Sequence, residues 1–152
     1  DELNDFLRPY GYFFGPDTST TNRCMIGGMV GNNSSGSTSI KYGVTRDKIL
    51  SLKTILSDGG TAVFGSLNKS EFIQRTKGGS LENSIYKNIF TKLSLPEVRE
   101  EIIKEFPKSN IHRRNNGYAV DDLINSEVFS DSDEKINIGR LLCGSEGTLA
   151  ST

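Results

Sequence analysis

The sequence of 152 residues contains no tryptophan, only one histidine and only two cysteines. Cys24 and Cys143 form no Cys-x-x-Cys pair, and His112 has no second histidine to join it, so neither a disulfide framework nor a Cys/His zinc site is supported. No apolar run approaches the roughly 20 residues that span a bilayer. These scarcities argue against a disulfide-stabilised mini-protein, a zinc-binding module and a membrane-spanning protein.

The chain also lacks an excess of charge of either sign. It has 18 Lys and Arg residues against 19 Asp and Glu residues, which makes a broad nucleic-acid groove unexpected. Hydrophobic residues make up 34% of the chain, a low share for a domain of this length, whereas 16 residues are glycine. Because the sequence begins at Asp1 without an initiator methionine and stops soon after Gly-Thr-Leu-Ala, we expect it to be part of a longer protein that shares its core.

Hydrophobic periodicity predicts a mixture of helices and strands. A short helix is expected near the start, then a loop rich in Gly, Ser, Thr and Asn over residues 15–43, then a β-hairpin over residues 48–64 that turns at Asp58-Gly59-Gly60. Apolar residues that step by four predict a helix over 81–93, and Pro96 favours the start of a second helix that ends before Pro107. The two helices are expected to form a helical hairpin, and an apolar turn over 120–124 and a strand over 141–143 complete an α+β chain.

The glycine-rich segment Ile26-Gly27-Gly28-Met29-Val30-Gly31-Asn32-Asn33-Ser34-Ser35-Gly36 carries the strongest chemical signal. Such a segment lets the backbone approach a ligand closely and presents N–H groups to phosphate or to a polar ring edge. It lacks the lysine of a P-loop and contains no Gly-x-Gly-x-x-Gly. The composition alone therefore leaves two interpretations open, a nucleotide-binding loop and a structural glycine turn.

Five segments in order resemble the FAD-linked oxidase family, whose FAD domain is of the vanillyl-alcohol-oxidase or p-cresol-methylhydroxylase (PCMH) type. They are Gly15-Pro16-Asp17-Thr18-Ser19-Thr20, the segment 26–36 above, Lys41-Tyr42-Gly43-Val44-Thr45-Arg46-Asp47, Leu56-Ser57-Asp58-Gly59 and Leu142-Cys143-Gly144-Ser145-Glu146-Gly147-Thr148-Leu149-Ala150, the last preceded by Asn116-Gly117-Tyr118. Within this family the sequence is most similar to the branch of glycolate oxidase flavoprotein subunits, D-lactate dehydrogenases and D-2-hydroxyglutarate dehydrogenases.

The resemblance implies that residues 1–152 are a partial FAD-binding domain, namely its second subdomain, with an antiparallel sheet flanked by helices and a helical insertion over residues 67–112. It also implies which residues contact FAD. Pro16, Asp17 and Ser19 would lie along the pyrophosphate and ribityl side, and Gly27, Gly28, Asn32, Asn33 and Gly36 would approach the flavin chain and ring through their backbone. Tyr42 and Gly43 would complete that wall, and Glu146 and Gly147 would lie near the adenosine end.

The implied activity is the oxidation of a D-2-hydroxy acid of the lactate, glycolate or 2-hydroxyglutarate class by hydride transfer to the flavin, with an electron acceptor as a further partner. No catalytic base and no metal ligand is identified in this sequence, and a fragment of this extent is expected to be inactive. Large bacterial members often carry an iron–sulfur region later in the chain. The expected location is the cytoplasm, including the inner face of a membrane. The alternative is a non-enzymatic binding or scaffold module whose glycine-rich loop binds an anion.

Overall fold

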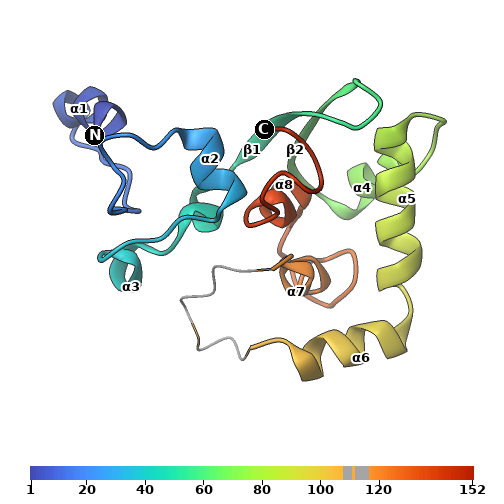
Figure 1. The fold of residues 1–152 in the computed structure, drawn as a ribbon. Coiled ribbons are helices and arrows are strands. Elements are labelled where there is room, and N and C mark those ends of the chain that lie inside the picture. Colours follow the sequence, from blue (N-terminus) through green and yellow to red (C-terminus); the bar gives the residue numbers. More distant parts are fainter. Residues whose placement is uncertain (108–110, 112–116) are drawn as a thin grey trace.

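The computed structural model describes residues 1–107, 111 and 117–152. In Figure 1 the first third of the chain lies on one side of the molecule and two longer helices lie on the other, with a hairpin and the C-terminal segment between them. Helices occur together with an antiparallel sheet. The predicted α+β class, with its antiparallel sheet, is therefore confirmed.

Short helical turns joined by loops make up the first 48 residues. They are α1 (Glu2–Leu7), the 3-10 turn η1 (Arg8–Tyr10), α2 (Ile26–Gly31), α3 (Ser39–Tyr42) and the 3-10 turn η2 (Thr45–Lys48). The predicted initial helix is present, but the loop predicted over residues 15–43 contains α2 and α3, so that prediction is wrong in part. Many large apolar side chains of this part are exposed, including those of Phe6, Tyr12 and Met25.

The predicted β-hairpin is confirmed, with strands β1 (Ser51–Ile55) and β2 (Thr61–Leu67). Its turn closes where the backbone N–H of Leu56 donates to the carbonyl oxygen of Gly60 at 2.8 Å. Gly59 has a φ of 79° there, a left-handed conformation that glycine adopts without the steric cost that a Cβ would add. The alternation of side chains along a strand directs Thr54, Ala62 and Phe64 into the core.

The sheet has the order β1-β2-β3, and all of its pairs are antiparallel. The short strand β3 (Ile136–Asn137) pairs with β2, with Asn137 opposite Ser66. At the other edge Ser151 and Ile55 exchange two backbone hydrogen bonds, of 2.9 and 3.1 Å. The C-terminal segment therefore returns to the hairpin and lies beside β1.

Three helices follow the hairpin: α4 (Lys69–Arg75), α5 (Leu81–Leu93) and α6 (Pro96–Glu105). Asn68 and Ser80 cap α4 and α5, each by accepting from the backbone N–H three residues later, which satisfies a donor that the first helical turn leaves unpaired. Pro96 is the first residue of α6, where its missing N–H costs nothing. The helices predicted at 81–93 and after Pro96 are confirmed, and no helix among the described residues is long and apolar enough to cross a bilayer.

The arrangement of α5 and α6 differs from the predicted helical hairpin. In Figure 1, α6 runs across the end of α5 instead of back along it. At this corner Arg99 of α6 donates from Nη1 to the carbonyl oxygen of Leu93 at 2.7 Å. This bond satisfies a carbonyl group at the end of α5 and connects that end to α6. The two helices therefore form a corner and not an antiparallel pair.

The C-terminal part contains α7 (Val120–Ile124) and α8 (Ile138–Leu142). The strand predicted at residues 141–143 is wrong, because α8 occupies that position and the strand ends earlier, at Asn137. The Oδ1 of Asn137 accepts from the backbone N–H of Gly139 at 2.9 Å and caps the helix. Ile138 and Leu142, one helical turn apart, are both buried, so helical spacing and not strand alternation directs these apolar side chains inward.

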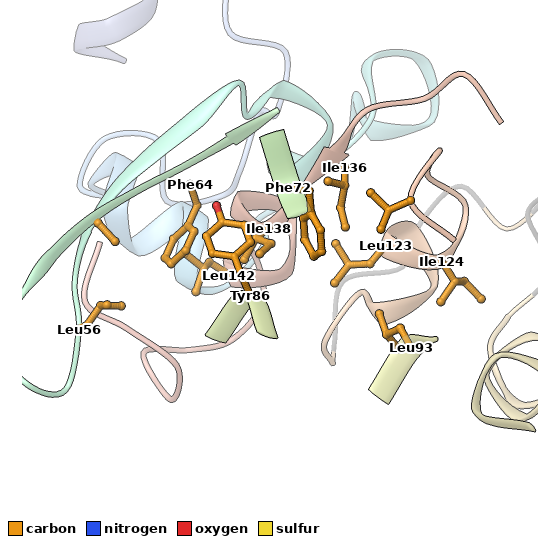
Figure 2. Close-up of a cluster of buried hydrophobic side chains, with 12 residues drawn as sticks. Leu56, Phe64, Phe72, Tyr86, Leu93, Leu123, Ile124, Ile136, Ile138 and Leu142 are labelled. Carbon is orange, nitrogen blue, oxygen red and sulfur yellow. The ribbon is translucent and has the colours of Figure 1, made fainter. Parts of the chain in front are cut away.

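The hydrophobic core lies between the hairpin and the helices that follow it (Figure 2). Phe64 of β2, Phe72 of α4 and Tyr86 of α5 form its aromatic centre, and the Phe72 and Tyr86 rings meet edge to face with centroids 5.3 Å apart. The aliphatic members come from the hairpin, α5, α7 and the loop after it, β3 and α8: Leu56, Ala62, Leu93, Leu123, Ile124, Val128, Ile136, Ile138 and Leu142. Through Ile138 and Leu142, α8 is thus packed into this core.

Candidate functional site

The glycine-rich segment begins with a helix, although glycine is a poor helix former. In α2 the backbone N–H of Met29 donates to Met25 and that of Asn32 donates to Gly28, at 2.9 and 3.0 Å. Met29 and Val30 are buried on one face of this turn. Burial of this pair stabilises a helix that the glycine residues alone would not favour, and Gly27 and Gly28 lie at its beginning.

The segment after α8 packs directly against the end of α2. The backbone N–H of Gly144 donates to the carbonyl oxygen of Val30 at 3.0 Å, and that of Glu146 donates to the carbonyl oxygen of Gly31 at 2.8 Å. Both carbonyl groups belong to the last turn of α2, and that of Val30 also accepts from the backbone N–H of Asn33 at 3.0 Å. Two glycine-containing segments that are far apart in the sequence are thereby joined backbone to backbone.

A hollow of about 470 Å³ lies where these two segments meet. Its lining residues are Gly27, Gly28, Gly31, Asn32, Glu146, Gly147, Ala150, Ser151 and Thr152. Five of the twelve residues that the sequence analysis assigns to FAD thus share one cavity, in the size range of small-molecule sites. The first wall of the hollow is formed by residues 27–32, and the second wall by residues 146–152.

Backbone and small side chains dominate the surface of this hollow. A Cβ added at Gly28 would meet no atom within 4 Å, so the space above this residue is open. Glu146 has a φ of 51°, which is uncommon for a residue with a side chain. It is the one charged side chain among the described lining residues. The hollow therefore offers glycine backbone and a single carboxylate acceptor to a ligand.

Four further predicted residues lie in a second group, where residues 15–17 pack against residues 36–43. A Cβ at Gly36 would come within 1.6 Å of the carbonyl oxygen of Asp17, so this position requires glycine for packing. A Cβ added at Gly15 would lie 2.7 Å from the Cβ of Tyr42, which is also too close. The Tyr42 ring meets the Phe13 ring edge to face, with centroids 4.9 Å apart. Gly43 has a φ of 77° and would clash with Asp47 if it carried a side chain.

Asn33 is fully buried and has a φ of 46°. Its Oδ1 accepts from the backbone N–H of Arg46 at 2.8 Å. Short polar side chains tolerate the left-handed conformation better than others, which explains asparagine here. The side chain of Asn33 therefore supports the loop from inside, and the neighbouring Asn32, which is exposed, is the one that reaches the hollow.

The remaining predicted residues lie outside the hollow. Pro16 is buried and lines a separate cavity near the N-terminus, and Ser19 is exposed in a turn. Tyr118 hydrogen bonds through its hydroxyl group to Oγ1 of Thr148 at 2.8 Å, so the predicted Gly117-Tyr118 element contacts the segment that follows Glu146. The positions 112–114 and 116, which include the single histidine and an arginine pair, lie outside the described residues.

Arg46 lies in the segment 41–47 that resembles the family, and no role is predicted for it from the sequence. It is 3% exposed, and its guanidinium donates to three backbone carbonyl groups: Nε to Arg140 at 3.1 Å, and Nη2 to Cys143 and to Gly117. No local sequence pattern distinguishes such a buried arginine from the exposed ones. Its contacts depend on residues more than 70 positions away, which only the fold brings close.

Cys143 lies at the end of α8 and is fully buried. Desolvation raises the pKa of its thiol to about 11, although the nearby charges of Arg46 and Arg140 act in the opposite direction. The thiol is therefore protonated at neutral pH and is not a nucleophile. Among the described residues no group of three or more His, Cys, Asp or Glu side chains is placed to hold a metal ion.

The family model of the FAD binding domain matches residues 1–65, which include α2, the first wall of the hollow and most of the hairpin. Residues 1–65 are therefore similar to the FAD binding domain family. The resemblance of the sequence to FAD-linked oxidases is thus confirmed, and the FAD binding domain contains all of the predicted contact residues except Glu146 and Gly147.

Relatives extend the similarity past the FAD binding domain to nearly the whole chain. A D-2-hydroxyglutarate dehydrogenase of Pantoea ananatis is 39% identical over 150 residues, and one of Escherichia coli is 37% identical over 150 residues; each alignment covers 99% of this chain and 14% of the relative. The glycolate oxidase subunit GlcD of Bacillus subtilis is 35% identical over 104 residues, which are 64% of this chain and 19% of that protein. The chain therefore spans about one seventh of the dehydrogenases that it matches, and no solved structure matches it.

Proposed function

We propose that this chain forms part of the FAD cradle of a flavin-dependent dehydrogenase that oxidises a D-2-hydroxy acid of the lactate, glycolate or 2-hydroxyglutarate class. The observation that carries the proposal is the hollow in which Gly27 and Gly28 of the FAD binding domain face Glu146 and Gly147. The relatives support the substrate class, because the Pantoea ananatis and Escherichia coli proteins are named for 2-hydroxyglutarate and the Bacillus subtilis subunit for glycolate, which are both 2-hydroxy acids.

The residues of the hollow fit a part of FAD that bears hydroxyl groups. Open space above Gly28 allows a ligand to approach the backbone of α2. The carboxylate of Glu146 is an acceptor for hydroxyl groups, whereas a pyrophosphate in the same place would be repelled by it. When bound, FAD supplies the redox chemistry, and the residues described here supply its binding and orientation.

An anion-binding scaffold is less compatible with this site. An anion needs cationic side chains or a convergent set of free N–H groups. The described lining residues include no Lys or Arg, and their one charged side chain, Glu146, would repel an anion. The hollow is therefore suited to an uncharged, hydroxyl-bearing group.

The finer architecture is also part of the proposal. We assign residues 1–152 to the second subdomain of a PCMH-type FAD domain and residues 67–112 to a helical insertion within it. The resemblance to the large bacterial branch supports an iron–sulfur region and an electron acceptor elsewhere in the full-length protein, and a cytoplasmic location. Seven of the predicted contacts, Pro16, Asp17, Ser19, Asn33, Gly36, Tyr42 and Gly43, would shape the cradle from outside the hollow.

Substitution of Gly28 by leucine tests the proposal in the full-length protein as its gene encodes it. Gly28→Leu fills open space in the hollow and improves the helix propensity of α2, so it is expected to weaken FAD binding without destabilising the protein. Gly79→Leu is the matched control, since this exposed glycine also has no atom near its Cβ position and lies outside the hollow. FAD affinity is measured by titration of the apoprotein and by flavin absorbance after gel filtration.

Equal FAD affinity in Gly28→Leu and Gly79→Leu would overturn the placement of FAD in the hollow. A folded full-length protein that takes up no FAD would overturn the proposed function as a whole. Once FAD is bound, a panel of D- and L-2-hydroxy acids with an artificial electron acceptor identifies the substrate. Turnover of none of the D-acids would contradict the proposed substrate class.

A further inference from the structure

We propose that Arg46 is a positioning residue for the cofactor site, and that its guanidinium fixes the position of the second wall of the hollow relative to the first. The inference rests on the proposed function, because it concerns the same hollow. Arg46 does not line the hollow. Its guanidinium acts through the backbone of Cys143, which lies three residues before the second wall begins at Glu146.

The guanidinium of Arg46 joins three segments of the chain at once. Two of its carbonyl partners, Arg140 and Cys143, lie in the last turn of α8 and at its end, where the helix dipole favours a cation. The Arg140 carbonyl also accepts from the backbone N–H of Cys143 at 3.3 Å. The third partner is Gly117, which precedes the tyrosine that hydrogen bonds to Thr148. One side chain therefore fixes the end of α8 and the approach to Tyr118.

The backbone of the same residue holds the first wall. The N–H of Arg46 donates to Oδ1 of Asn33 at 2.8 Å. Beside it, Thr45 donates to the carbonyl oxygen of Ser34 from both its backbone N–H and its Oγ1, at 3.0 and 2.7 Å. Residues 45 and 46 thus anchor the loop that continues directly from α2.

The two walls meet immediately after the residue that the guanidinium holds. Gly144 and Glu146 follow Cys143, and their N–H groups pair with Val30 and Gly31. A shift of Cys143 would therefore move Glu146 relative to Gly28. The hydrophobic core anchors α8 through Ile138 and Leu142. It does not fix the direction of the backbone after Leu142, where the helix ends.

An arginine suits this role better than any other side chain. Its planar fork carries five N–H donors and remains charged at every relevant pH, so it can serve several carbonyl groups in fixed directions. A lysine ammonium is a compact donor on a flexible stem and cannot reproduce this geometry. Arg46→Lys should therefore keep the charge and lose part of the positioning, and Arg46→Met should lose both.

The test measures FAD affinity of the full-length apoprotein in Arg46→Met, Arg46→Lys and a control, Arg99→Met. The control removes another arginine-to-carbonyl hydrogen bond, at the corner between α5 and α6, away from the hollow. Titrations are performed well below the melting temperature of each apoprotein. We expect Arg46→Met to weaken FAD binding roughly 10- to 100-fold, as for outer-shell residues that orient metal ligands, Arg46→Lys to be intermediate, and Arg99→Met to match the wild type.

The visible circular dichroism of bound flavin provides a readout that a loss of stability alone would not change. We expect this spectrum to differ from the wild type in both Arg46 variants and to be unchanged in Arg99→Met. Arg46 variants with wild-type affinity and spectrum would overturn the inference and leave the proposed function intact, provided that Gly28→Leu still weakens binding. If Arg46→Met does not fold, Arg46→Lys decides. A wild-type protein without FAD affinity would instead overturn the proposed function.

Discussion

Gly36 lies against the backbone of Asp17 so closely that the Cβ of any other residue would come within 1.6 Å of the Asp17 carbonyl oxygen. The contact joins the segment after Gly15 to the end of the glycine-rich loop. An oxygen of the main chain cannot rotate away as a flexible side chain would. This glycine is therefore required for folding whether or not a ligand contacts it.

Gly36→Ala is expected to destabilise the 152-residue chain by about 3 kcal/mol or more, because the backbone must move to relieve the overlap. Gly28→Ala is the control, since nothing lies within 4 Å of its Cβ position, and it should change stability by no more than about 1 kcal/mol. Chemical denaturation followed by circular dichroism measures both. If Gly36→Ala unfolds at the wild-type midpoint, the close packing of residues 17 and 36 is wrong.

Phe72→Ala is expected to cost about 3–5 kcal/mol. Phe72 is fully buried and its ring meets those of Tyr86, Phe90 and Phe129, so the substitution leaves a cavity at the aromatic centre of the core. The same denaturation measurement tests it. Phe6→Ala, at a ring that is 66% exposed, should change stability by less than about 0.5 kcal/mol, and equal effects of the two substitutions would contradict the described core.

Cys143 is expected to resist alkylation in the folded protein. Its pKa of about 11 leaves only roughly one thiol in a thousand ionised at pH 8, and the thiolate is the species that reacts. Labelling with iodoacetamide, read by mass spectrometry of the peptides, should modify the partly exposed Cys24 at least roughly tenfold faster than Cys143. Guanidinium chloride should abolish this difference, and rapid labelling of Cys143 without denaturant would refute its burial.

The same thiol makes stability depend on pH. Between pH 9 and 11 the unfolded chain loses the Cys143 proton while the folded protein keeps it, so the free energy of unfolding should fall as the pH rises through this window. Tyr86, whose pKa burial raises from 10.0 to about 12, acts in the same direction at higher pH. In Cys143→Ala the decrease between pH 9 and 11 should be smaller by roughly 1–3 kcal/mol. An unchanged pH profile in this variant would contradict the raised pKa.

Local sequence signals predicted the elements whose formation depends on near neighbours. The hairpin follows from alternating residues around Asp58-Gly59-Gly60, and α6 begins at Pro96 as its missing N–H suggests. Apolar residues spaced four apart from Leu81 to Leu93 predicted α5. This pattern does not include Tyr86, which is the most deeply buried residue of that helix. Periodicity identifies a helix more reliably than the side chain that packs deepest.

The amino-acid sequence alone was enough to predict an α+β chain, its hairpin, its longer helices and its resemblance to the FAD-linked oxidases, which the match of residues 1–65 to the FAD binding domain supports. The tertiary structure decided that Gly28 and Glu146 share one hollow and that a buried guanidinium joins their supports. It also decided that residues 138–142 are helical. The physical reason is that these features depend on hydrogen bonds and burial between segments far apart in the chain, which no local pattern of residues encodes.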